Sequence, residues 1–415
     1  MHKAKPRVIL ITYYFRPSIE MGALRPTRFY KYLKAMGYPV HAITATPQGA
    51  DCPADIHVIP DELEARWEKG SQKGPKRNSL GACFEWLIRQ FMFPGHIGML
   101  WAFKAAALCK TIRRQYPSDS FALVVTYPPL GTLLVGLLAG QARLPWIADF
   151  RDPIASLILQ GEPGYVKFWA RSLEKRVFRQ ASAIIANVEP AAVVWRERYP
   201  WAQQKLHVIY NGFDPQEAPR ARPIPPRDYK RIVHAGTFHH GRNADVVLLS
   251  LGRLRAKGVP EAQSAKVQLA GVQEGEVWLN WELCREAERD GRLELRGPIT
   301  WNEWEQVVGE ADGLLLAQPH STVQIPAKLY GYVCIGRPIL ALLARSSPVE
   351  PILKNSAVPH VIIYSDDNDE TIDRKVLEFL RLPNTPAPIN DWYRTNFSCE
   401  VQTESLARII DQIAR

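Results

Sequence analysis

The sequence lacks the features that mark a secreted, zinc-binding or membrane-spanning protein. Its six cysteines are scattered, with no Cys-x-x-Cys pair and no histidine pair nearby, which argues against a disulfide framework and a zinc site and predicts reduced thiols in a cytoplasmic protein. The N-terminal apolar run is short and is soon followed by Arg16, so it predicts a first strand and not a secretory signal. No P-loop, GxGxxG, HExxH or GxSxG motif is present, which removes kinases, dinucleotide-dependent dehydrogenases, zinc proteases and α/β-hydrolases from the leading candidates.

Excess positive charge is confined to the N-terminal half. Residues 1–200 hold 27 Lys and Arg against 15 Asp and Glu, a net +12, and the remaining residues hold 25 against 27, a net −2. No helix-turn-helix, RNP or zinc-finger pattern accompanies this charge, so we expect no nucleic-acid partner. The segment at 84–110 is rich in Trp, Phe and Leu but is broken by Arg89, Pro94 and Lys104, and a bilayer span needs about 20 apolar residues. Two interpretations remain for this segment: contact with an anionic membrane surface, or ordinary core helices.

The chain is long enough for two domains, and their organisation follows from its alternating pattern. Short apolar β-branched runs alternate with helical patterns, which predicts parallel sheets with crossover helices. We expect an N-terminal Rossmann-like domain at 1–214, a Pro-rich linker at 215–230, a C-terminal Rossmann-like domain at 231–390, and a C-terminal helix at 391–415, for which a return to the N-terminal domain is one option. The predicted fold class is α/β, with two doubly wound domains facing a central cleft.

Candidate site residues of the N-terminal domain follow predicted strands. Gly22 lies between the first strand and a helix, where the backbone can approach a phosphate; a simple turn is the alternative. Asp149 and Arg151 follow a later strand, and we expect them to be free to face the cleft as catalytic candidates. An ion pair that holds their loop is the alternative interpretation.

In the C-terminal domain the candidates suit an anionic ligand. Gly236 follows a strand and permits close approach, and Arg242 suits a diphosphate in a fork geometry. Lys328 stands near a helix N-terminus within Ile-Pro-Ala-Lys-Leu-Tyr-Gly, where it suits the same charge; the alternative is a lysine extending from an amphipathic helix. The acidic stretch at 366–369 predicts a solvated turn, and we expect no metal site.

Six segments in order resemble family 4 glycosyltransferases of the GT-B fold, of the type that builds lipopolysaccharide or exopolysaccharide. They are YYFRPSIEMGALRPTRFYKYLKAMGYPVHAIT, LPWIADFRDP, EKRVFRQASAIIANVEP, VIYNGFD, HAGTFHHGR and IPAKLYGYVCIGRPIL. The resemblance implies transfer from a nucleotide-diphosphate sugar, bound by the C-terminal domain, to a glycan or lipid-linked acceptor bound by the N-terminal domain. It implies a retaining reaction with no metal or cofactor, in the cytoplasm, with peripheral contact to the inner face of the plasma membrane as one option.

Carried over by position, the resemblance places Gly22 beside the donor diphosphate. It assigns the rest of donor binding to the second domain, through Gly236, Thr237, Arg242, Gln324, Lys328 and Gly331. Three departures stand out: the family's paired glutamates map onto Val323 and Gly331, with Gln324 adjoining the first; a basic residue is replaced by Thr237; and an acceptor-side histidine aligns near Tyr127. Loss of the second glutamate removes a charge-assisted hydrogen bond to ribose, of order 1.5–3 kcal/mol.

Two other functions stay open because of Gly331. One is a non-catalytic GT-B relative that binds glycan or a partner transferase. The other is a GT-B-like epimerase that acts on a nucleotide sugar.

Overall fold

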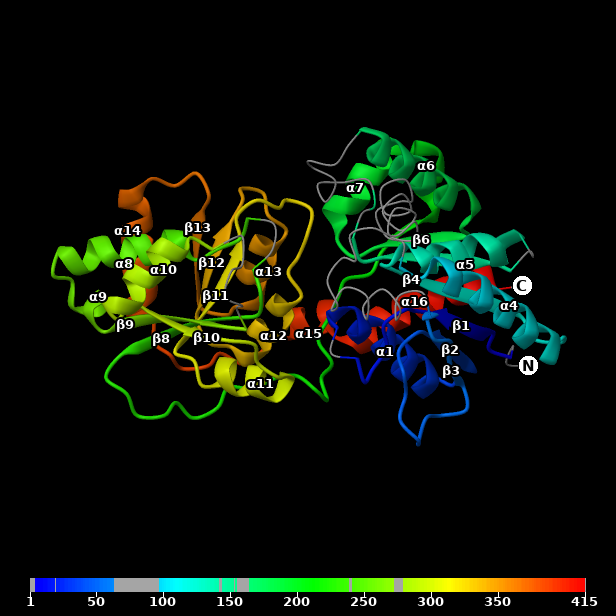
Figure 1. The fold of residues 1–415 in the computed structure, drawn as a ribbon, viewed down its shortest axis with the longest axis horizontal. Coiled ribbons are helices and arrows are strands. Elements are labelled where there is room, and N and C mark those ends of the chain that lie inside the picture. Colours follow the sequence, from blue (N-terminus) through cyan, green and yellow to red (C-terminus); the bar gives the residue numbers. More distant parts are fainter. Residues whose placement is uncertain are drawn as a thin grey trace, which may run out of the picture. The chain divides into compact units, whose positions relative to one another are not determined.

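The computed structural model describes residues 4–18, 20–62, 97–141, 144–152, 154, 164–238, 241–271 and 279–414. The contacts between residues divide the chain into two compact units (Figure 1). The first unit is Met1–Asn211 with Cys399–Arg415, and the second is Gly212–Ser398.

A seven-stranded parallel sheet forms the centre of the first unit, with the order β3-β2-β1-β4-β5-β6-β7. Its strands are β1 (Arg7–Ile11), β2 (Val40–Thr44), β3 (Ile56–Val58), β4 (Phe121–Tyr127), β5 (Trp146–Phe150), β6 (Ala183–Ala186) and β7 (Leu206–Val208). The helices are α1 (Met21–Ala35), α4 (Met99–Gln115), α5 (Leu130–Gln141), α6 (Gly164–Gln180), α7 (Glu189–Arg198), the 3-10 helix η2 (Pro200–Lys205) and α16 (Cys399–Ile413).

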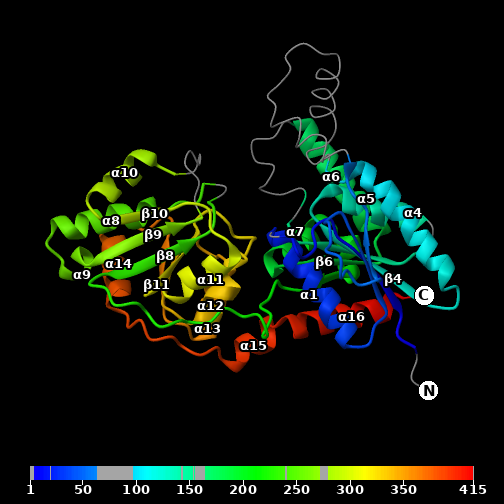
Figure 2. The ribbon, with the colours of Figure 1, turned by 60° about the horizontal axis from the view of Figure 1, so that its bottom comes forward.

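Helices cover both faces of this sheet, so its central strands are apolar on both sides. Every residue of β2 and β5 is buried. On one face, α1 and α16 pack with β1, β4 and β5 in a shared core. On the other face α4 packs on α5, and α5 contacts α6 (Figure 2).

A six-stranded parallel sheet forms the centre of the second unit, with the order β10-β9-β8-β11-β12-β13. Its strands are β8 (Lys230–Ala235), β9 (Ala265–Ala270), β10 (Leu293–Arg296), β11 (Gly313–Gln318), β12 (Ile339–Leu343) and β13 (His360–Tyr364). The helices are α8 (Asp245–Ala256), α9 (Pro260–Gln263), α10 (Trp281–Arg289), α11 (Trp301–Gly309), α12 (Lys328–Ile335), α13 (Val349–Ser356), α14 (Asp369–Arg381) and α15 (Asp391–Phe397). Both units are therefore doubly wound α/β layers, as the alternating sequence pattern predicts.

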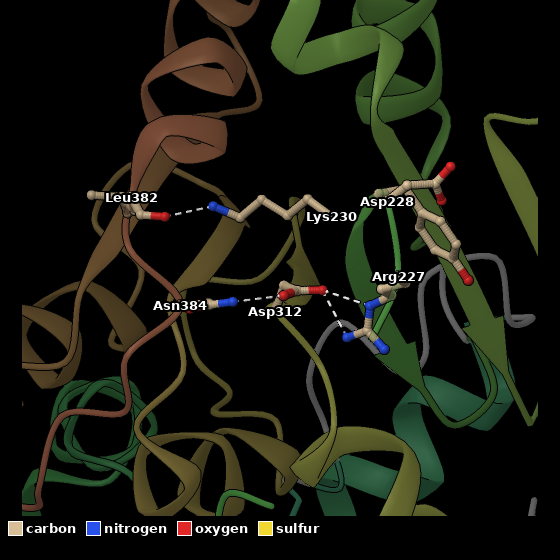
Figure 3. Close-up of a pocket in the computed structure, with 7 residues that line it drawn as sticks. Arg227, Asp228, Lys230, Asp312, Leu382 and Asn384 are labelled. Atoms are coloured by element: carbon tan, nitrogen blue, oxygen red, sulfur yellow. Dashed lines mark hydrogen bonds and ion pairs between the residues drawn. The ribbon is translucent and has the colours of Figure 1, made fainter. Parts of the chain in front are cut away.

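The sequence predicts a linker at 215–230, but this segment packs along the second unit. The guanidinium of Arg227 donates to Asp312 Oδ2 at 2.7 Å and to Glu310 O at 2.7 Å. Lys230 Nζ donates to Leu382 O at 2.6 Å (Figure 3). These contacts surround a depression of about 410 Å³ at the amino edge of β8 and β11. Because ligands of parallel α/β sheets bind at the opposite edge, we interpret this depression as structural.

The C-terminal segment at 391–415 is divided between the units. Helix α15 belongs to the second unit, and α16 belongs to the first. There Leu406 and Ile410 are fully buried, and Tyr38 Oη donates to Asp411 at 2.9 Å. This docking gives the first unit a helix from the far end of the chain.

Most of the aromatic segment at 84–110 lies outside the described residues. Its last part forms the start of α4, in which Trp101 is buried while Leu100 and Phe103 are exposed. Among the residues that the structure describes, no helix is long and apolar enough to cross a membrane.

A buried ion pair joins α1 to β5. Asp149 is fully buried at the end of β5, and it accepts from Arg25 Nη2 at 2.7 Å and from Arg25 Nε at 3.0 Å. Arg25 also donates to Tyr210 O at 2.8 Å. One guanidinium therefore fixes a helix, a strand and the segment by which the chain leaves the first unit.

We predict that Asp149→Asn lowers the free energy of unfolding by about 3–5 kcal/mol, because it leaves the guanidinium of Arg25 buried without its counter-ion. Urea denaturation followed by circular dichroism measures this change. The matched control is Glu62→Gln, which breaks an exposed pair with Lys104 and is expected to change stability by less than about 1 kcal/mol. Similar small losses in both variants would contradict the role given to Asp149.

Candidate functional site

Two glycines bring the backbone of neighbouring strands together at the carboxyl edge of the second sheet. Gly236 follows β8 with φ 108°, and Gly271 follows β9 with φ 87°. A Cβ on Gly271 would lie 3.2 Å from Gly236 Cα. Both positions therefore favour glycine for the positive φ, and Gly271 also for the close approach to the backbone of Gly236. The result is a stretch of backbone without side chains at the edge where ligands of such sheets bind.

A cation stands over this stretch. Lys328 is the first residue of α12, and a Cβ on Gly236 would lie 3.4 Å from its Nζ. The same Nζ lies 3.0 Å from His234 Nε2. The predicted pair Gly236 and Lys328 is thus brought together, with an ammonium group at a glycine-lined edge.

His234 is a neutral partner for that lysine. Its ring is buried on β8, stacks on Phe238 with centroids 3.9 Å apart, and has Nδ1 3.2 Å from Leu315 O. Burial, together with the positive charges of Lys328 and Arg242, holds the pKa of His234 well below its ordinary value of 6.5. Because a carbonyl only accepts, Nδ1 carries the proton and Nε2 accepts from Lys328. His234 therefore positions the amine of Lys328 without adding negative charge to it.

The other predicted donor-binding residues of the second unit are placed less directly. Arg242 is near enough to lower the pKa of His234 through its charge. A Cβ on Gly241 would lie 3.4 Å from His320 Cδ2, so the loops that follow β8 and β11 adjoin. Thr237 is exposed, and Gln324 is half-buried in the loop after β11. All of these belong to segments that leave the carboxyl edge.

Gly331 packs against side chains that do not belong to this glycine-lined edge. A Cβ there would lie 3.1 Å from Trp304 Cη2 and 3.4 Å from Pro219 Cγ. Trp304 belongs to α11 and stacks on Trp301 with centroids 4.9 Å apart. The indole therefore occupies the space next to the position where the resemblance places a glutamate.

A second cation lies at the start of α1 in the first unit. A Cβ on Gly22 would lie 2.7 Å from Arg151 Nη1. Arg151 donates from Nη2 to Pro128 O at 3.0 Å and from Nε to Tyr127 O at 3.2 Å. Burial lowers the pKa of Arg151 from its ordinary value. The structure thus brings the predicted Gly22 and Arg151 together beside the first turn of a 15-residue helix.

The expectation that Asp149 faces the cleft is wrong. Its side chain is fully buried and belongs to the ion pair with Arg25. The alternative interpretation from the sequence, an ion pair that holds the loop, describes this residue. Arg151, the other catalytic candidate, lies beside Gly22 at the start of α1.

Two residues of the second site were not found from the sequence. One is His234. The other is Gln318, the last residue of β11, which is 1% exposed and whose amide nitrogen and oxygen have no hydrogen-bond partner among the described residues. A polar residue that ends the apolar run Gly-Leu-Leu-Leu-Ala is the signal that could have indicated it. A buried amide without partners costs about 1–3 kcal/mol, so a polar group or a water molecule that hydrogen-bonds to Gln318 would stabilise it.

We predict that His234→Phe lowers the free energy of unfolding by about 1–3 kcal/mol, because Leu315 O and the lysine amine lose a partner while ring packing is kept. A double-mutant cycle with Lys328→Met, measured by urea denaturation, is expected to give a coupling of about 1 kcal/mol. His360→Phe is the matched control at the amino end of β13, with no coupling to Lys328→Met. Additive losses for His234 and Lys328 would show that the contact does not position the lysine.

Comparison with known proteins gives a family match in the first unit and structural matches over the whole chain. The sequence model of Glycosyltransferase Family 4 matches residues 27–217. No curated protein shows significant sequence similarity to the chain.

Solved structures match both units. A sucrose-phosphate synthase from Thermosynechococcus elongatus has a TM-score of 0.64 at 13% identity and covers 98% of this chain and 99% of its own. A structure of trehalose-6-phosphate from E. coli bound with UDP-2-fluoro glucose has a TM-score of 0.64 at 12% identity and covers 99% of this chain and 100% of its own. Anabaena Alr3699/HepE in complex with UDP-glucose has a TM-score of 0.61 at 14% identity, with 98% and 100% covered. At such identities the likeness concerns the fold, and it confirms the predicted GT-B fold of two Rossmann-like domains.

Proposed function

We propose that the protein is a glycosyltransferase that moves a sugar from a nucleotide-diphosphate donor to a glycan or lipid-linked acceptor in cell-surface polysaccharide biosynthesis. The observation that carries the proposal is Lys328, an ammonium group held by a neutral histidine over the backbone of Gly236. The family match in the first unit and the GT-B fold support it. UDP-glucose in the complex of the Anabaena protein supports a nucleotide sugar as the donor class.

The chemistry of the proposed transfer explains why a cation is needed there. The bond between the anomeric carbon and the diphosphate oxygen breaks, and its electron pair stays on that oxygen. The anomeric carbon then bonds to the acceptor hydroxyl oxygen, and the proton of that hydroxyl passes to the departing diphosphate. Positive charge fixed beside the leaving oxygen stabilises the transition state more than the substrate. Lys328 and Arg242 supply this charge in the proposal, which is therefore metal-independent; retention at the anomeric carbon is carried over from the resemblance.

The donor also needs polar contacts beyond its diphosphate. In the proposal, the amide of Gln318 and the loop residues Thr237 and Gln324 supply them at the same edge. In the proposal, Gly22 and Arg151 of the first unit also bind an anionic group. We place the protein in the cytoplasm, with peripheral contact to the inner face of the plasma membrane.

We predict that Lys328→Ala weakens binding of the donor by about 10- to 100-fold, the loss of charge-assisted hydrogen bonds to a phosphate group. A thermal-shift screen against nucleotide sugars identifies the donor, and isothermal titration calorimetry measures the change. Lys354→Ala is the matched control, because this exposed lysine pairs with Glu350 on α13. Binding of no nucleotide by the unaltered protein would contradict the proposed function, and unchanged affinity in Lys328→Ala would contradict the site.

The donor assay also distinguishes the competing functions. Release of nucleoside diphosphate that requires an acceptor is expected for a transferase. Conversion of the nucleotide sugar to its epimer would identify an epimerase. Binding without turnover in the presence of every acceptor tested would identify a non-catalytic relative.

We predict that Gly331→Glu does not improve donor affinity and lowers the melting temperature. The new side chain would meet the indole of Trp304, and overpacking of this kind costs typically about 1–3 kcal/mol. Calorimetry with the donor and thermal unfolding measure the two effects. A gain in affinity of tenfold or more, about 1.4 kcal/mol, would show instead that the position still reaches the ligand.

A further inference from the structure

Helix α6 carries large aromatic side chains on its outer surface. Phe168 is 65% exposed and Trp169 is 53% exposed, although the opposite side of the helix is ordinary core, with Val177 and Phe178 fully buried. Isolated exposed apolar residues are common, whereas adjacent exposed aromatic side chains are typical of interaction surfaces.

Cations continue this surface along the helix. Phe168, Arg171, Lys175 and Arg179 recur at intervals of three and four residues, so they share one exposed face. Arg176 is also exposed, and the single acid of α6, Glu174, is fully buried, where it accepts from Arg198 at 2.9 Å. The outer face of α6 therefore combines exposed aromatic side chains with basic ones, and the helix contributes no acidic side chain to it.

Helix α4 repeats the arrangement. Leu100 is 57% exposed and Phe103 is 60% exposed in its first turns, and the helix contains four basic residues and no acid. Because α4 packs on α5 and α5 contacts α6, the three helices lie along one face of the sheet (Figure 2). Helices that connect parallel strands run antiparallel to them, so the first turns of α4 and α6 lie toward the carboxyl edge of the first sheet.

We propose that the outer face of α6, with the first turns of α4, docks the first unit on an anionic lipid bilayer. Aromatic side chains favour the level of the lipid headgroups, and basic side chains bind the phosphates there. Taken with the proposed function, on which this part rests, the docking brings the carboxyl edge of the first sheet to the depth of a lipid-linked acceptor. Of the two proposed acceptor classes, a glycan and a lipid-linked acceptor, the docking therefore favours the lipid-linked one.

Vesicle co-sedimentation of the full chain tests the proposal. The protein is expected to bind vesicles in which phosphatidylglycerol replaces part of the phosphatidylcholine, and to bind phosphatidylcholine alone far more weakly. Added salt should release it, since screening removes the attraction of exposed charges. Equal binding to both vesicle types, or none to either, would overturn the docking.

Two variants assign the binding to α6. Arg171→Gln, Lys175→Gln and Arg179→Gln combined are expected to lower the partition coefficient by about 100-fold, from about fivefold per cation near the surface. Phe168→Ser with Trp169→Ser is expected to lower it by about tenfold. Trp301→Ser, in the second unit and 41% exposed, is the matched control and should bind as the unaltered protein does. Unchanged binding in both α6 variants would overturn the assignment.

Parallel measurements separate this proposal from its alternatives. Donor binding without vesicles is expected to be the same in all these variants, so a chain that binds vesicles but no nucleotide contradicts only the proposed function. Light scattering reports the oligomeric state: a change caused by Phe168→Ser with Trp169→Ser, with vesicle binding retained, would identify a protein interface and overturn the lipid surface.

Discussion

The buried ion pair between Arg25 and Asp149 is the constraint on which the first unit depends. A carboxylate with no exposure is stable only beside an opposite charge and hydrogen-bond donors, and one guanidinium supplies both. Because Arg25 also donates to Tyr210 O, the position of α1 is fixed by two segments distant in sequence. That position sets Gly22, in the first turn of α1, against Arg151. The arrangement of Gly22 and Arg151 therefore depends on the charge of Asp149, although Asp149 itself is buried.

In the second unit, a neutral group contacts the cation Lys328. Lys328 contacts a histidine whose pKa burial holds low. A neutral ring nitrogen orients the amine through a hydrogen bond and adds no negative charge of its own. The ammonium group is thus oriented before a ligand binds. Stabilisation of a departing diphosphate requires such a preorganised positive charge.

The sequence predicted the fold class and part of the site because both follow from local patterns. Alternating strand and helix periods specify parallel layers, and a glycine after a strand or a lysine at a helix start marks the ligand edge, as at Gly236 and Lys328. The burial of Asp149 could not be predicted, because its partner is 124 residues away and no local pattern shows which arginine of α1 faces inward. Local pattern likewise could not show that Arg227, within the predicted linker at 215–230, binds Asp312 of the second unit.

Gly331 has a physical explanation that the sequence could not supply. A glycine in a helix interior costs up to about 1 kcal/mol relative to alanine, so its presence in α12 calls for a compensating contact. The indole of Trp304 provides one, since it packs where a side chain would otherwise project. In the proposed enzyme the ribose therefore lacks the carboxylate acceptor that the resemblance places at this position, and only neutral groups could take its place. A neutral hydrogen bond contributes about 0.5–1.5 kcal/mol, against about 1.5–3 for one to a charged group. Donor affinity must then rest mainly on the diphosphate, which makes the lysine that His234 orients more important here than in an enzyme that keeps both glutamates.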